Sequence, residues 1–163
     1  MYTNLITSAV GLTPRRLHEL CTAGLDHNQV SLQADETVTA DGIAAAPVHV
    51  AKLAAIAAIR HSGLAWTLNV VLHAANIDRV EQLIALAERL EAPRLELANV
   101  QFYGWAVRNR ESIVPTREQI VHAEAIAAAA AEPLRGTMRI AFVAADDFEA
   151  FPKPCMNGWD DAT

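Results

Sequence analysis

Short apolar runs alternate along this chain with longer segments in which apolar residues recur every three to four positions. The short runs are rich in Val, Ile, Leu and aromatic residues, which favours strands, and the longer segments have helical spacing. Regular alternation of the two predicts an α/β protein with right-handed crossovers between parallel strands. The five predicted strands span residues 2–7, 28–33, 66–72, 95–102 and 138–143.

Four helices are predicted from their start and stop signals. The first begins with Thr13 as N-cap and Pro14 at the first helical position, and Gly24 ends it. The second spans about residues 47–62 and is closed by Gly63. Two more are predicted where a residue pair has the spacing of a capping box. These pairs are Asp78 with Glu81, and Thr116 with Gln119.

Two of the strands are continuously apolar, at residues 70–72 and 140–143. A strand with one wet face would alternate, so this pattern predicts a parallel sheet covered on both faces. No linker rich in Gly, Pro or Ser divides residues 1–145, which are predicted to form one domain. The hydrophobic period stops after that point, and residues 146–163 are predicted to be an irregular connector.

Charge and composition exclude several classes of partner. The formal net charge is -6 and no run of Lys or Arg is present, so we expect neither nucleic acid nor a membrane as partner. No apolar run approaches the ~18 residues of a membrane span, and the start lacks the features of a signal peptide. A cytoplasmic protein is therefore expected. The two cysteines, Cys21 and Cys155, lie far apart in a chain with no sign of secretion, so no disulfide is predicted.

Polar residues at the ends of the predicted strands are the candidate ligand contacts, because ligands of parallel α/β folds lie beyond the carboxyl ends of the strands. Each of these residues has the alternative of being a satisfied core or turn residue. The common nucleotide, hydrolase and metalloprotease motifs are absent, and the six histidines lack metal-ligand spacing. The candidates are Thr3, Asn4, Ser31, Gln33, Asn69, His73, Asn99, Gln101 and Tyr103.

Several segments, in order and spanning about residues 2–159, resemble one enzyme family. They are YTNLITSAVGLT, AGLDHNQVSLQA, WTLNVVLHAANIDRVEQLIALAERL, RLELANVQFYGWAVRNR and KPCMNGW. With these segments the chain resembles the coenzyme PQQ synthesis protein E family, which are radical S-adenosylmethionine (SAM) oxidoreductases with a C-terminal Fe–S (SPASM) extension.

The resemblance implies a partial parallel (β/α) barrel of the radical SAM type that begins at the third strand. It also implies the family's chemistry, a carbon–carbon bond between a Glu and a Tyr of a ribosomal precursor peptide in pyrroloquinoline quinone biosynthesis. The cofactors implied are SAM and a [4Fe-4S] cluster. The partners implied are the precursor peptide and its small carrier protein.

The resemblance also assigns roles to single residues. Cys155 matches the first ligand of an auxiliary Fe–S cluster in the family's extension. The residues implied to contact the cofactor are Thr3, Asn4, Ser31 and Asn69. Those implied to face either substrate or cofactor are Gln33, His73, Gln101 and Tyr103.

The chain departs from the family in its cysteines. The CxxxCxxC motif that binds the SAM cluster is absent, and two cysteines cannot ligate a four-cysteine cluster. We therefore expect a truncated homologue that binds no cofactor by itself, is inactive alone, and associates through exposed sheet edges. Two alternatives remain open at this point: an autonomous flavodoxin-like domain for a small ligand, and a remnant that binds the peptide without catalysis.

Overall fold

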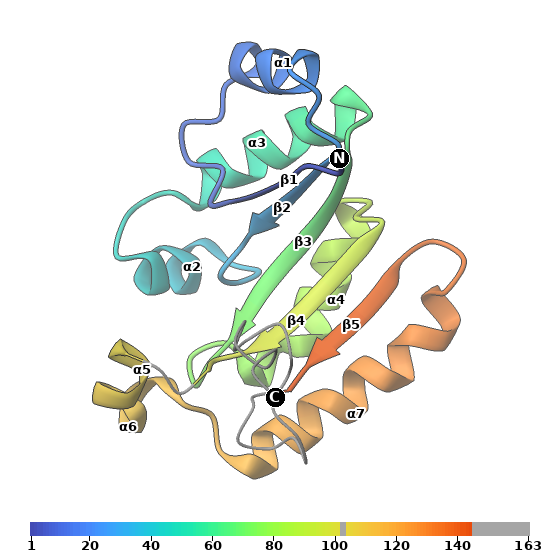
Figure 1. Ribbon diagram of the computed structural model, residues 1–163. Coiled ribbons are helices and arrows are strands. Elements are labelled where there is room, and N and C mark those ends of the chain that lie inside the picture. Colours follow the sequence, from blue (N-terminus) through green and yellow to red (C-terminus); the bar gives the residue numbers. More distant parts are fainter. Residues whose placement is uncertain (102–103, 145–163) are drawn as a thin grey trace, which may run out of the picture.

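The computed structural model describes residues 1–101 and 104–144, which form one five-stranded parallel sheet and its helices (Figure 1). The strands are β1 (Asn4–Thr7), β2 (His27–Ser31), β3 (Ala65–Leu72), β4 (Arg94–Asn99) and β5 (Arg139–Val143). The helices are α1 (Pro14–Thr22), α2 (Thr37–Ala44), α3 (His49–Ser62), α4 (Val80–Arg89), α5 (Trp105–Arg108), α6 (Arg110–Ile113) and α7 (Arg117–Leu134), with a 3₁₀ turn η1 (Ile77–Arg79) before α4.

The strands lie in the sheet in the order of the sequence, β1-β2-β3-β4-β5, and every neighbouring pair is parallel. A flavodoxin-like sheet would reverse direction at a switch point and so break this order. Sequential parallel strands are instead the arrangement of a (β/α) barrel. The predicted α/β class is confirmed, and the flavodoxin-like alternative is wrong.

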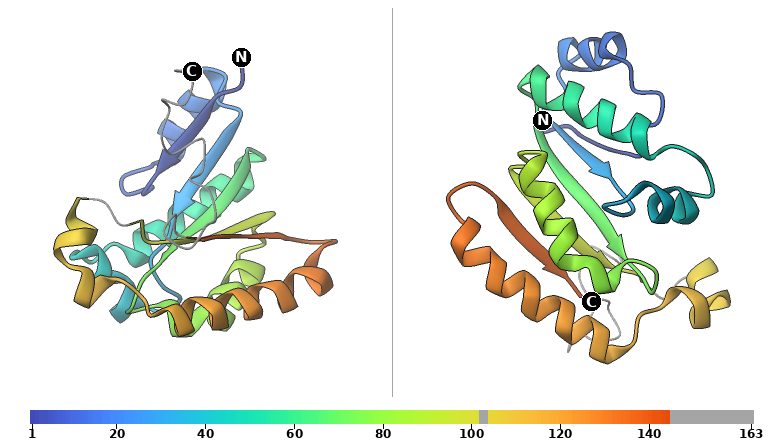
Figure 2. Two further views of the ribbon diagram at one scale, coloured as in Figure 1. Left: turned by 60° about the horizontal axis from the view of Figure 1, so that its bottom comes forward. Right: turned by 180° about the vertical axis from the view of Figure 1, so that it is seen from behind.

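The helices α3, α4 and α7 lie on one side of the sheet, as the view from behind shows (Figure 2). When strands advance in one direction, right-handed crossovers all fall on the same face. The crossover helices of the described residues therefore cover one face, and the prediction that they cover both faces is wrong. On β3 the residues between the core positions lie on the other face, where Thr67 and Asn69 are polar but only 3% and 7% exposed, and Val71 is 43% exposed.

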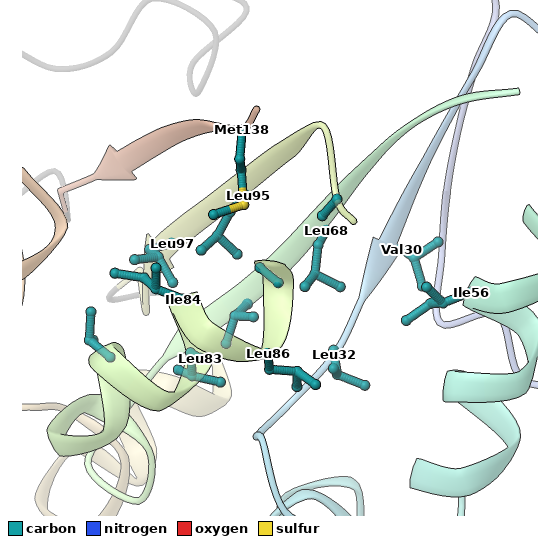
Figure 3. Packing of buried hydrophobic residues seen from close by; sticks show 14 of the residues in the cluster. Val30, Leu32, Ile56, Leu68, Leu83, Ile84, Leu86, Leu95, Leu97 and Met138 are labelled. Carbon is teal, nitrogen blue, oxygen red and sulfur yellow. The ribbon is translucent and has the colours of Figure 1, made fainter. Parts of the chain in front are cut away.

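The hydrophobic core fills the space between this covered face and the helices (Figure 3). Leu68 of β3 and Leu95 of β4 are fully buried, and Ile56 of α3 and Leu83 of α4 pack in the same cluster. A buried leucine or isoleucine contributes about 1.5–3 kcal/mol by leaving water. Cys21 of α1 is partly buried and packs against the cluster.

The predicted helix ends are confirmed at three of four helices. Thr13 accepts a hydrogen bond from the Arg16 amide, and Gly63 has the left-handed φ of +73° that ends α3. The Thr116–Gln119 capping box is present at α7. The capping box predicted at Asp78 is wrong, because Asp78 lies inside the 3₁₀ turn and α4 starts at Val80 with Arg79 as its N-cap and no side-chain cap.

Three helices were not predicted from the sequence. The segment that forms α2, TVTADGIA, contains β-branched residues and Gly42 and has no clear helical period. The helices α5 and α6 have four residues each, too few to show a period. These three helices lie near the carboxyl ends of the strands (Figure 1), so they help to shape that edge of the sheet.

Two further predictions concern the membrane and the domain boundary. Within the described ranges no single helix is long and apolar enough to cross a membrane, although α2 and α3 taken together, with a bend of 101°, meet the criteria of length and composition. The predicted connector at 146–163, with Cys155, lies outside the described residues, as does Tyr103. The division at residue 145 stays a prediction.

Candidate functional site on the open face of the sheet

The sheet face turned away from α3, α4 and α7 has polar residues on all five strands. The strand register places these side chains on one face, because Asn4 pairs with His27, Ser31 with Asn69, and Asn69 with Glu96. We call this surface the open face. Its polar residues are Asn4, His27, Gln29, Ser31, Thr67, Asn69, Arg94, Glu96 and Arg139.

His27 links three strands near the amino end of the open face. Its Nδ1 lies 2.8 Å from Asn4 Oδ1 and its Nε2 lies 3.0 Å from Thr67 Oγ1. An amide oxygen only accepts, so Nδ1–H donates to Asn4 and Nε2 accepts from the Thr67 hydroxyl. Burial, and to a lesser degree the positive charge of Arg94, lower the pKa of His27. The imidazole is thus held neutral as a bridge between strands.

Glu96 is the acceptor at the centre of the open face. Its Oε1 accepts from Asn69 Nδ2 at 3.0 Å and from Gln29 Nε2 at 3.2 Å. The Arg94 guanidinium lies 3.8 Å from Oε2. A carboxylate in the interior of a sheet would be costly without partners, and these three groups compensate it.

Lys52 extends from α3 to the carboxyl end of β2. It is only 3% exposed, and its Nζ donates to the Ser31 carbonyl at 3.1 Å and to Gln33 Oε1 at 2.6 Å. Burial lowers the pKa of the Lys52 ammonium. Among the residues that the structure describes, no carboxylate forms an ion pair with it. A buried cation with only neutral acceptors is rare in protein interiors. Where one occurs, it is often part of a functional site.

Asn76 joins the loops that follow β2 and β3. Its Nδ2 donates to the carbonyls of Gln33 (2.8 Å) and Val71 (2.9 Å), and its Oδ1 accepts from the His73 amide (2.9 Å). His73 Nδ1 accepts from the Ala75 amide, so the proton of the neutral ring lies on Nε2. Burial lowers the pKa of His73. Its buried Nε2 has no partner among the described residues.

An ion pair closes the outer side of the same edge. Arg79 donates from Nε and Nη2 to the two oxygens of Asp35, at 2.7 and 2.6 Å, and its Nη1 lies 3.2 Å from Glu36. The bidentate contact lowers the pKa of Asp35 and raises that of Arg79. This pair anchors the loop before α2 to η1.

The structure brings together four of the residues predicted as site residues. Ser31 and Asn69 are paired across β2 and β3, Gln33 follows directly, and His73 is tied to Gln33 through Asn76. Gln101 lies beyond β4, with Nε2 3.5 Å from the carbonyls of Asn99 and Ala144. Their contacts with cofactor or substrate stay predictions.

Two other candidates lie at the opposite edge. Thr3 and Asn4 stand at the amino end of β1, where Thr3 Oγ1 donates to the Gly24 carbonyl and bonds Asp26. The expectation that they mark the carboxyl end is wrong, because the strand starts at Asn4 and ends at Thr7. Their predicted contact with cofactor is not tested.

Asn99 has the orientation of a core residue. It is 3% exposed on the helix side of β4, where its Nδ2 donates to the Val143 carbonyl at 2.9 Å. It therefore ties β4 to β5 and does not belong to the open face. Its position at a strand end did not show this, but the alternation of Leu95 and Leu97 with Arg94 and Glu96 in the sequence places Asn99 on the leucine face.

Sequence reasoning missed Lys52, although a signal for it exists. Lys52 stands four residues after Val48 and four before Ile56, within the apolar stripe of α3. A lysine at a core-facing position of an amphipathic helix either buries its charge or extends its side chain to the edge of the neighbouring sheet. Here it does both.

The residues present do not fit an iron–sulfur cluster. No group of three or more His, Cys, Asp or Glu side chains that could hold a metal ion occurs in residues 1–101 and 104–144. The cysteine within those ranges, Cys21, packs against the core. The chain's own described residues therefore cannot hold the cluster that the resemblance implies.

Comparison with known sequences gives strong similarity to one group of enzymes. The chain is 46% identical over 158 residues to a PqqA peptide cyclase of Streptomyces rochei, and 48% identical over 163 residues to one of Ruegeria pomeroyi. These matches include 97% and 99% of the chain but 43% and 44% of the two relatives. The chain thus spans less than half the length of the curated relatives it matches. The resemblance found in the sequence is confirmed, and no family model matches.

Comparison with solved structures gives the same fold. The crystal structure of Streptococcus suis SuiB bound to S-adenosylmethionine matches with a TM-score of 0.67 at 13% identity, over 93% of the chain and 35% of SuiB. SuiB bound to its precursor peptide SuiA matches with a TM-score of 0.66, over 88% of the chain and 32% of SuiB. The predicted partial barrel is confirmed by this likeness and by the sequential strand order.

Proposed function

We infer that this chain corresponds to a part of a PqqA peptide cyclase, a radical SAM enzyme of pyrroloquinoline quinone biosynthesis. One observation carries the inference: identity of 44–48% to enzymes of that name over nearly the whole chain. The parent reaction joins a Glu and a Tyr of a precursor peptide through a carbon–carbon bond. In that parent enzyme, the segment that corresponds to this chain would provide strands of the barrel and a polar interior surface.

The open face suits this share because its polar groups point away from the core. A barrel interior that binds SAM and a peptide needs hydrogen-bonding groups held on rigid strands. Gln29 and Asn69 are fixed by Glu96, and Gln33 is fixed by Lys52. SuiB, which shares the fold, binds both S-adenosylmethionine and a precursor peptide.

The described residues do not support radical chemistry by this chain alone. A [4Fe-4S] cluster delivers the electron that cleaves SAM in the parent family, and no ligand set for it exists among those residues. We therefore propose that the chain binds ligand without turning it over. Anaerobic reconstitution followed by reduction should give no 5′-deoxyadenosine, and stoichiometric formation of that product would contradict the proposal.

The proposed partners are the precursor peptide, its small carrier protein, and a second copy of the chain through sheet edges. Support differs between them. The peptide has the support of the SuiB–SuiA structure, while the carrier follows from the parent family only. A cytoplasmic location is also proposed; its support is that no single helix of the described residues is long and apolar enough to cross a membrane.

Peptide binding tests the proposed function directly. A fluorescein-labelled precursor peptide that carries the Glu and Tyr of the parent reaction is titrated with the chain, and anisotropy is measured. We expect saturable binding that a scrambled peptide does not show. Gln29→Ala, on the open face, should weaken binding about fivefold, the effect of one lost hydrogen bond.

Gln82→Ala is the matched control, because Gln82 is exposed on α4, which lies on the other side of the sheet. Its affinity should equal that of the wild type. Equal binding of the scrambled peptide, or no saturation at all, would contradict the proposal. Saturable binding with no SAM cleavage would favour the peptide-binding remnant over an active enzyme.

A further inference from the structure

The amide of Gln33 has a defined orientation. Lys52 Nζ lies 2.6 Å from Oε1, and an ammonium group only donates. Oε1 must therefore face the lysine, which leaves both N–H groups of Nε2 turned away from it. No protein atom in the described part of the chain accepts from Nε2. Gln33 thus presents donors.

Two amides of the open face have the opposite orientation. Asn69 Nδ2 and Gln29 Nε2 both donate to Glu96 Oε1, and a carboxylate only accepts. The carbonyl oxygens of these two amides must therefore point away from Glu96. Neither oxygen has a protein donor within residues 1–101 and 104–144. Asn69 and Gln29 thus present acceptors.

Asn76, which joins two loops, uses both ends of its amide. Asn76 is 1% exposed, donates twice and accepts once, so nothing is left for a ligand. Gln33, Asn69 and Gln29 each use one end only. The charged group behind each amide decides which end remains.

The two kinds of amide are neighbours. Ser31 pairs with Asn69, and Gln33 follows two residues later, about 6.6 Å further along the same chain. The donor therefore lies at the carboxyl edge and the acceptors lie deeper on the open face. One ligand with two polar groups of opposite kind can reach both.

We propose that Lys52 and Glu96 are positioning residues that set this polarity, and that the open face binds a ligand carrying an acceptor oxygen near Gln33 and an N–H donor near Asn69. An α-amino-acid group and a peptide unit both have this pair of groups. The inference deepens the proposed function, since either SAM's amino-acid end or the peptide backbone would provide the pair. It does not depend on that function, because any amino-acid or peptide ligand satisfies it.

Side-chain amide signals in the ¹⁵N NMR spectrum of the full chain test the proposal. The probes are L-methionine for the amino-acid group and N-acetylalanine methylamide for the peptide unit. Propionate, with only acceptors, and methylamine, with only donors, are the comparators. We expect at least one probe to shift the Gln33 and Asn69 amide signals together and saturably, with about tenfold lower Kd than either comparator.

Two variants test the role of the charges. Lys52→Met removes the donor behind Gln33, and Glu96→Gln replaces an obligate acceptor by an amide that can also donate. Both should raise the Kd of the preferred probe about tenfold while the backbone spectrum stays dispersed. Lys52→Arg, which still donates, should stay within about threefold of the wild type.

Glu88→Gln, at an exposed position of α4, is the control and should not change the Kd. Unchanged affinity in Lys52→Met and Glu96→Gln would overturn the proposal. So would a wild-type chain that binds neither probe better than its comparators. Binding of methionine or the blocked alanine without binding of the precursor peptide would refute the proposed function and leave this inference standing.

Discussion

Side-chain amides connect the loops at the carboxyl edge of the sheet, and Asn76 makes the most contacts. It is 1% exposed, and its three hydrogen bonds join the loops after β2 and β3. Neither loop has regular structure at this point, so their backbone groups depend on the side chain for partners. Asn76, which has no role in ligand contact, thus fixes the positions of Gln33 and His73.

Asn76→Ala should destabilise the chain by about 2–4 kcal/mol, because it leaves buried backbone groups without partners. Urea denaturation monitored by circular dichroism measures the change in the free energy of unfolding. Gln82→Ala, at an exposed position, should change it by less than about 0.5 kcal/mol. A loss no larger than that of the control would show that water replaces the amide.

The His73 imidazole should make stability depend on pH. Its pKa is lowered by burial, so between that value and the unfolded value of about 6.5 the unfolded chain binds more protons. Stability is therefore complete above pH 6.5 and falls as the pH is lowered through this window. His27 acts with the same sign.

His73→Gln should reduce the loss of unfolding free energy between pH 7.5 and pH 5, compared with the wild type. Urea denaturation at the two pH values measures that difference. His122→Gln, on the exposed side of α7, should leave the difference unchanged. The assignment to His73 fails if both variants behave alike.

At the scale of elements, capping decides where the long helix α7 begins. Thr116 Oγ1 accepts from the Gln119 amide at 3.2 Å, and Gln119 Oε1 accepts from the Thr116 amide at 3.0 Å. Gln119 Nε2 also donates to Asp78, which links α7 to η1. Asp78 was predicted to cap α4. The sequence signal therefore identified a residue that contacts a helix start, but it assigned this residue to α4 when its contact is with α7.

Thr116→Ala should destabilise the chain by about 1 kcal/mol, through loss of the capping box. Thr22→Ala, at the exposed last position of α1, is the matched control and should be neutral or slightly stabilising. Thermal unfolding of the two variants measures the difference. Equal midpoints would show that packing of α7 alone sets its start.

At the scale of the molecule, the described residues form a sheet with its crossover helices on one side, and the outer strands β1 and β5 each pair with one neighbour in this part of the chain. Such edges favour pairing with another chain. On β1 the apolar Ile6 is 66% exposed and lies on the open face. Self-association through this edge is therefore expected of the isolated chain.

Ile6→Lys should weaken self-association at least tenfold, because it places a charge on the edge strand. Sedimentation equilibrium at several concentrations gives the association constant. Val121→Lys makes the same change at an exposed position of α7 and should have little effect. A monomeric wild type, or equal effects of the two substitutions, would exclude association through β1.

The sequence by itself determined the five strands, the four main helices and the family, because these depend on local periodicity, caps and continuous motifs. Only the tertiary structure decided which face of the sheet is covered, since this follows from the direction and handedness of every crossover together. It also decided that Lys52, 21 residues after Ser31 in the chain, lies against the Ser31 carbonyl. Such contacts join residues distant in sequence, and no local pattern encodes them.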